Sequence, residues 1–128
     1  MIEPIDDDAF SASASQEPSR IVITFRGSTE LDTKPLLDRF LLQVHEEARR
    51  CAVVEVAADM RGAAFVNSAC LKALAWWIMM AVDQGGAAYR VTFVTSKAHA
   101  WQRRSLAALA SLAPRAVSIV DDQLQGQQ

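Results

Sequence analysis

Short apolar runs alternate along the chain with longer segments in which apolar side chains recur at every third or fourth position. The short runs are β-branched, aromatic or otherwise apolar, which predicts strands, and the longer segments have the period of helices. Strands that alternate with helices favour βαβ units with right-handed crossovers and a largely parallel sheet. The predicted order is strand 21–25, helix 33–49, strand 51–58, helix 68–84, strand 89–94, helix 97–112 and strand 117–120.

The predicted helices are bounded by residues that commonly start or stop helices. Thr33 is expected to cap the first helix, Asn67 or Ser68 the second, and Thr95-Ser96 the third, because their side chains can accept hydrogen bonds from free backbone N–H groups. Gly85-Gly86 is expected to stop the second helix.

The apolar run at 51–58 is the longest candidate strand. Its side chains scarcely alternate with polar ones, which predicts a strand covered on both faces. Asp59 is expected to end it, and a turn that contains Gly62 should follow. Glu55 is the one carboxylate inside the run, and we interpret its position as an edge or rim of the sheet.

The two ends of the chain differ from its middle. Within residues 1–20, serine alternates with alanine at 11–15, and two prolines interrupt the segment, so we expect a flexible leader with an edge strand around Ile2–Ile5. Residues 122–128 form a polar tail. A length of 128 residues suits one domain, which we place at 21–121.

Composition and charge exclude several classes of protein. Apolar residues make up 51% and charged residues 22%, as in ordinary globular domains, and a net charge of -2 gives no nucleic-acid footprint. The longest apolar run, Ala73–Val82, is too short to span a bilayer, which takes about 18 residues or more. An acidic N-terminus is unlike a secretion signal, and Cys51 and Cys70 are expected to be free thiols. These features predict a cytoplasmic protein without membrane insertion.

The residues that usually carry catalysis are scattered. His45 is expected to lie exposed in a helix and His99 at a helix start, with no cysteine or histidine cluster to hold a metal. The chain also lacks a P-loop, a dinucleotide-binding glycine motif and a serine nucleophile elbow. We therefore predict no metal, no cofactor and no enzymatic activity.

One predicted helix is apolar nearly all round. Trp76, Trp77, Met79 and Met80 occupy more faces of it than one sheet can cover. Either neighbouring helices bury these side chains, or some of them form a surface for a partner, since Trp and Met are both favoured at interfaces.

The ordered set of short motifs from Ile21 to about Asp121 resembles the STAS domain, the fold of bacterial anti-sigma-factor antagonists. The matching pieces are a strand that ends in Gly27, the loop Leu31-Asp32, the strand-end Asp59, and the turn 65–68 (Phe-Val-Asn-Ser) at a helix start. The resemblance implies an α/β fold with a largely parallel mixed sheet of four to five strands flanked by helices. The last helix of the family pattern is missing from this sequence, and Asn67 stands where the family has aspartate.

In this family, kinases of the anti-sigma type bind around the turn and in many members phosphorylate its serine. A phosphate at a helix N-terminus is favoured by free N–H groups and the helix dipole. The resemblance therefore implies that Ser68 is the phosphate acceptor and that a serine-kinase anti-sigma factor, or a related switch kinase, docks around it. The implied contact residues are Gly27, Asp32, Asp59, Asn67, Ser68, Ala69 and Lys72.

Two other functions stay open at this point. STAS-like domains also serve as accessory subunits of transporters or signalling complexes, and the missing last helix together with the Trp- and Met-rich helix would suit burial in an assembly or self-association. A nucleotide or lipid binder is the third alternative, although no phosphate-cradling sequence supports it.

Overall fold

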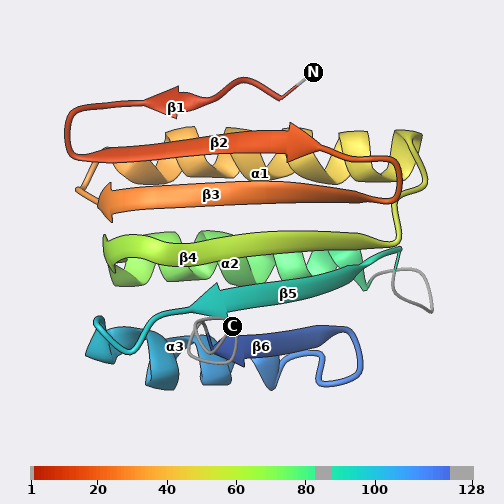
Figure 1. Cartoon of the computed structure of the whole chain (residues 1–128). Coiled ribbons are helices and arrows are strands. Elements are labelled where there is room, and N and C mark those ends of the chain that lie inside the picture. Colours follow the sequence, from red (N-terminus) through yellow and green to blue (C-terminus); the bar gives the residue numbers. More distant parts are fainter. Residues whose placement is uncertain (1, 83–87, 122–128) are drawn as a thin grey trace, which may run out of the picture.

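The computed structural model of the chain describes residues 2–82 and 88–121, which form one six-stranded sheet and three helices (Figure 1). The strands are β1 (Ile5–Asp6), β2 (Phe10–Gln16), β3 (Arg20–Ser28), β4 (Glu55–Phe65), β5 (Arg90–Thr95) and β6 (Val117–Asp121). The helices are α1 (Thr33–Arg50), α2 (Ser68–Ala81) and α3 (Ala100–Ala110).

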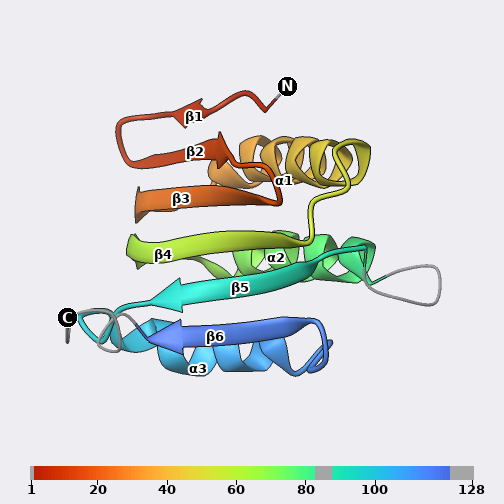
Figure 2. The same ribbon diagram turned by 45° about the vertical axis from the view of Figure 1, so that its right-hand side comes forward.

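The sheet is mixed, and its strands lie side by side in the order of the sequence. The pairs β1–β2 and β2–β3 are antiparallel, and the pairs from β3 to β6 are parallel. When each parallel crossover is right-handed and each new strand joins the same edge, every connecting helix falls on the same face of the sheet. Figures 1 and 2 show α1, α2 and α3 on one face, so the prediction that β4 is covered on both faces was wrong.

The leader forms more structure than predicted: the edge strand expected around Ile2–Ile5 is observed at Ile5–Asp6, and the longer strand β2 was not predicted. The serine–alanine alternation at 11–16 is part of β2, which pairs with β3 along its whole length, and β1 adds a short edge beyond it. Phe10 and Ala12 face the core, and the Phe10 ring stacks on that of Phe25 at 5.9 Å. The alternation thus lies in a strand, but only the first part of this strand has a buried face, since Ala14 is exposed. The sheet has six strands, one or two more than expected.

Strand β4 begins later and ends later than predicted. Residues 51–54 precede it, and Cys51 is the C-cap of α1. Beyond Asp59 the strand continues to Phe65, and Gly62 lies inside it, beside Arg26 of β3, rather than in a turn. Glu55 is the first residue of a central strand, so it lies at the rim of the sheet and not on an edge strand. It accepts a hydrogen bond from Thr92 at 2.7 Å and lies 3.6 Å from the Arg20 guanidinium.

The core lies between the sheet and the three helices and contains a buried polar chain. The Trp77 indole N–H donates to the Tyr89 hydroxyl at 2.9 Å, and that hydroxyl lies 2.7 Å from His45 Nδ1. His45, which was expected to be exposed, is therefore buried between α1 and β5. Burial lowers its pKa, with a second lowering effect from the Arg49 charge and a smaller opposite effect from Glu46.

The remaining helix ends differ from prediction by a few residues. Helix α3 starts at Ala100 instead of Lys97, and the Ser96 hydroxyl accepts from the Ala98 N–H in the turn before it. Helix α2 ends at Ala81, while Gly85-Gly86 and the polar tail lie outside the described residues. The predicted absence of a helix after β6 falls on residues 122–128, which also lie outside the described residues. No helix in residues 2–82 and 88–121 is long and apolar enough to cross a membrane.

Candidate functional site

The candidate site lies at the carboxyl ends of β3 and β4, where the two strands lead into α1 and α2. These strands are parallel neighbours, so the loop 29–32 and the turn 66–67 emerge at the same edge of the sheet (Figure 1). The site is therefore assembled from two segments that are almost 40 residues apart in sequence, as the bond between Asn67 and Thr29 shows.

Asn67 makes three hydrogen bonds, one that caps α2 and two that join the two segments. Its side-chain oxygen accepts from the Cys70 N–H at 2.9 Å and caps α2, as predicted. Its side-chain N–H₂ donates to the Glu30 carbonyl at 3.1 Å, and its backbone N–H donates to the Thr29 hydroxyl at 2.7 Å. A carboxylate in this position could cap the helix but could not donate to Glu30. The amide at position 67 therefore fits the bonds that this site makes.

The loop from β3 is fixed by further bonds. The Thr29 N–H donates to the Phe65 carbonyl at 3.0 Å, which ties the loop to the last residue of β4. The Thr33 hydroxyl accepts from the Glu30 N–H at 2.8 Å. Thr33 is the first helical residue, and the N-cap position belongs to Asp32, whose side chain makes no capping bond, so the prediction of Thr33 as the cap was wrong.

Gly27 allows the chain to turn into this loop, and its role is in the backbone rather than in a side-chain contact. Its φ of 91° lies in the left-handed region. A Cβ at this position would overlap the Ala9 carbonyl oxygen, which accepts a hydrogen bond from the Ser28 N–H at 2.8 Å. Gly27 is therefore required by the close approach of the chain before β2 to the end of β3.

Ser68 is the first residue of α2 and is exposed. Its hydroxyl has no hydrogen-bond partner among the residues that the structure describes, so it is not used as a helix cap. Lys72, also exposed, lies one helical turn further on, where i,i+4 side chains are neighbours. Ala69 between them is half-buried.

Asp59 does not contribute to the turn. It lies within β4, and its neighbours Ala58 and Met60 are buried toward the helices, so its own side chain points to the uncovered face of the sheet. The Arg61 side chain donates to both carboxylate oxygens at 2.9 Å. This hydrogen bonding is the main cause of the lowered pKa of Asp59. Asp59 is better explained as an ion-paired residue of the sheet than as a neighbour of Ser68.

Four exposed apolar side chains lie beside the predicted contact residues, and two of them belong to the helix for which either burial or a partner surface was expected. Leu31, at the tip of the loop, is 98% exposed, and Phe65 at the end of β4 is half exposed. On α2, Trp76 is 69% exposed and Met79 about half, whereas Trp77 is completely buried. The Trp- and Met-rich helix thus serves both the core and the surface. A stripe of exposed residues runs down α2 through Ser68, Lys72, Trp76 and Met79.

Comparison with known proteins supports the fold. No protein-family model matches the sequence, and neither does any curated protein. Among solved structures, an anti-sigma factor antagonist from Mycobacterium paratuberculosis is similar to this chain, with a TM-score of 0.62 and 16% sequence identity over 90% of this chain and 88% of that one. The chain therefore has the STAS-like α/β fold predicted from its sequence. At this level of identity the likeness concerns the fold.

Proposed function

We propose that this protein is a regulatory binding domain that acts as an anti-sigma-factor antagonist. Its partner is a serine-kinase anti-sigma factor or a related switch kinase in the bacterial cytoplasm. The binding surface consists of Leu31 and Asp32 on the loop, the Asn67-Ser68 turn, and the exposed stripe of α2. The observation that carries this proposal is the exposed, unbonded Ser68 hydroxyl beside a loop that Asn67 holds in place.

The preformed loop favours protein binding. A surface loop that is already ordered loses little conformational entropy when a partner binds. Leu31 gives this loop a fully exposed apolar side chain, and Trp76 and Met79 extend the apolar surface along α2. Apolar and aromatic side chains of this kind commonly supply most of the binding energy of an interface.

Phosphorylation of Ser68 would control the release of the partner. A phosphate at this first helical position carries a charge of about -1.5 to -2 and would face the free N–H groups of the helix start. The Lys72 ammonium, one turn on, could pair with it. The same charge would be buried against the kinase in the complex, where desolvation and repulsion by acidic groups weaken binding.

The proposal is tested by incubating the protein with ATP and each serine-kinase anti-sigma factor encoded in the same genome, and by locating the phosphate by mass spectrometry. We expect one phosphate, on Ser68, with at least one of these kinases. Phosphate on another residue, or on none with any of the kinases, would contradict the phosphoswitch. Ser68→Ala is the matched control, because the unbonded hydroxyl can be removed without loss of a helix cap.

The second candidate function is an accessory subunit of a transporter or signalling complex that works without phosphorylation. The exposed Trp76 and Met79 favour it, because such side chains are frequently covered in permanent assemblies. Trp76→Ala would then release the protein from its complex, whereas Ser68→Asp would leave the complex intact. The reverse result supports the kinase partner.

A further inference from the structure

Charged residues are segregated between the two ends of the sheet. From Ile2 to Ser19 the chain has acidic residues and no lysine or arginine, and these residues form the β1 edge. From Ser96 to Val120 it has four basic residues and no acidic one, and this segment forms α3 and most of β6 at the opposite edge. Five strand spacings of about 4.8 Å put these edges roughly 24 Å apart. At a physiological Debye length of about 8 Å, the two charged ends therefore hardly interact within one molecule.

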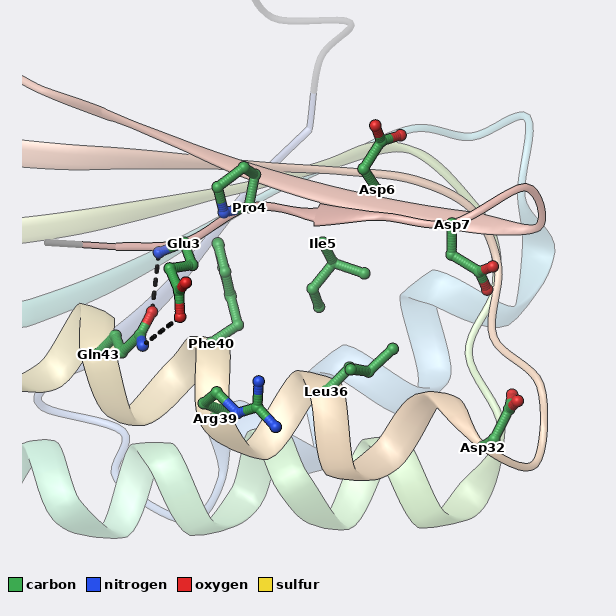
Figure 3. A pocket seen from close by; sticks show the side chains of 10 residues that line it. All are labelled: Glu3, Pro4, Ile5, Asp6, Asp7, Asp32, Leu36, Arg39, Phe40 and Gln43. Carbon is green, nitrogen blue, oxygen red and sulfur yellow. Dashed lines mark hydrogen bonds between the residues drawn. The ribbon is translucent and has the colours of Figure 1, made fainter.

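The acidic end contains a groove between the segment around β1 and α1, with a volume of about 320 Å³. Figure 3 shows Ile5 and Leu36 pointing toward one another across it, with Glu3 at one end and Asp7 and Asp32 at the other. Leu36 and Phe40 give the groove an apolar floor. Its lining also includes Pro4, Asp6, Arg39 and Gln43.

The groove keeps its negative charge because few of its ionic groups are neutralised. Asp6 points away from the helix, and Arg39 is the only basic residue of the lining. None of Asp6, Asp7, Asp32 and Arg39 forms an ion pair with another residue in the described part of the chain. Glu3 is held by Gln43, whose side chain donates to the Glu3 carboxylate at 3.3 Å. An apolar floor ringed by carboxylates fits a basic segment with small apolar side chains.

The outward face of α3 has that chemistry. It carries Arg103 and Arg104, neither of which forms an ion pair within the described residues. Around them are exposed alanines, Ala100, Ala107 and Ala108, where a surface helix normally has charged or long polar residues. Leu112, just beyond the helix, is also about half exposed. Small side chains allow this face to approach another surface closely, and no element of the described chain covers it.

We propose that the α3 face of one molecule docks in the acidic groove of a second copy. The complementarity is the argument for this occupant: Arg103 and Arg104 would meet Asp7 and Asp32, and the alanines would lie over Leu36. Because the two surfaces are different and lie at opposite edges, the contact is head-to-tail, and each copy keeps one groove and one α3 face for the next. The contact shares Asp32 with the surface proposed for the kinase, but it does not include Ser68 and does not depend on phosphorylation of Ser68.

Sedimentation equilibrium of the untagged protein tests the proposal. At low salt the average mass should rise with concentration above the 14.0 kDa of the monomer, and it should fall back as salt is raised. Two double variants should each weaken association by about tenfold or more. The α3 variant carries Arg103→Glu with Arg104→Glu, and the groove variant carries Asp7→Lys with Asp32→Asn. Lys72→Glu with Arg26→Glu has the same charge change as the α3 variant and should leave association intact.

Mixing the two variants gives the sharpest result. The groove variant keeps a native α3 face and the α3 variant keeps a native groove, so an equimolar mixture can form one productive contact and should stop at the dimer. Neutral variants, Arg103→Gln with Arg104→Gln and Asp7→Asn with Asp32→Asn, repeat the test if a charge reversal unfolds the protein. A monomeric wild type at low salt, association that survives both variants, or a mixture that stays monomeric would overturn the proposal. Binding of a duplex DNA probe by a monomeric wild type would also overturn it, since the α3 face would then serve another macromolecule.

Discussion

Replacing Asn67 with aspartate, the residue of the family pattern, is expected to destabilise this protein although aspartate is itself a good helix cap. The substitution keeps the acceptor for the Cys70 N–H but removes the N–H₂ group that donates to the Glu30 carbonyl. It also sets a carboxylate oxygen near that carbonyl, where the nitrogen now lies at 3.1 Å. The loop that carries Leu31 would then lose one of its ties to α2.

The magnitude follows from these contacts. Loss of the bond to Glu30 costs about 1 kcal/mol, and the repulsion between the two oxygens costs about as much. The interaction of the new carboxylate with the helix dipole stabilises the folded variant by about 0.5 kcal/mol. The free energy of unfolding should therefore fall by about 1–1.5 kcal/mol. Asn67→Ser keeps a cap and loses only the bond to Glu30, about 1 kcal/mol, whereas Asn67→Ala loses both, about 2 kcal/mol.

Urea denaturation followed by circular dichroism measures all three variants. Amide hydrogen exchange supplies a local readout: the Glu30 N–H, which donates to Thr33, should exchange faster in the aspartate variant than in the wild type. An aspartate variant as stable as the wild type to within about 0.5 kcal/mol would mean that the Glu30 bond contributes nothing to stability. Equal stability of the serine and alanine variants would refute the capping role.

Three further predictions concern the fold. His45 is buried and its pKa is lowered, so the free energy of unfolding should decline as the pH falls below about 6.5, the pKa of histidine in the unfolded chain. Denaturant titrations of His45→Gln at several pH values should show a weaker decline. A decline as steep as that of the wild type would mean that another group causes it. Trp77→Phe should lower the free energy of unfolding by about 1–3 kcal/mol, because the bond to Tyr89 is lost and a cavity is left. Trp76→Phe should change it by less than about 0.5 kcal/mol, because Trp76 is exposed. Similar losses for the two variants would contradict the burial of Trp77 and the exposure of Trp76. Gly27→Ala should lower the free energy of unfolding, measured in thermal melts, by about 1–3 kcal/mol. Gly62→Ala should lower it less, because its Cβ would lie 3.0 Å from the Phe25 carbonyl oxygen. The opposite ranking would argue against the need for glycine at the positive φ of position 27.

The sequence was sufficient for the βαβ core because each element there buries one side, and burial imposes a period on the apolar residues. The helices predicted at 33–49 and 68–84 are observed at 33–50 and 68–81, and the parallel strands were predicted on the same basis. The leader was misread because Ala12 is the one buried residue between 11 and 16, and an alanine carries almost no hydrophobic signal. Gly62 was read as a turn because glycine inside a strand resembles a breaker, and only the pairing with Arg26 shows otherwise.

The site was predictable where it depends on local rules and unpredictable where it depends on contacts between distant segments. The capping role of Asn67 follows from its place before an apolar helix, and it was predicted. Its bonds to Thr29 and Glu30 join segments that are 37–38 residues apart, and no pattern in the sequence of either segment predicts that they are in contact. Likewise, the sequence does not distinguish Trp76 from Trp77, and only the packing of α2 shows that Trp76 is exposed and Trp77 is buried.

The most direct test of the proposed function is the affinity of the protein for its kinase partner when the charge at position 68 is changed. Titration calorimetry of the wild type, Ser68→Ala and Ser68→Asp against the same serine-kinase anti-sigma factor supplies it. We expect Ser68→Ala to bind as the wild type does and Ser68→Asp to bind about tenfold or more weakly, because a charge at the start of α2 is desolvated in the complex. Equal affinity of the two variants would contradict the control of docking by charge at Ser68.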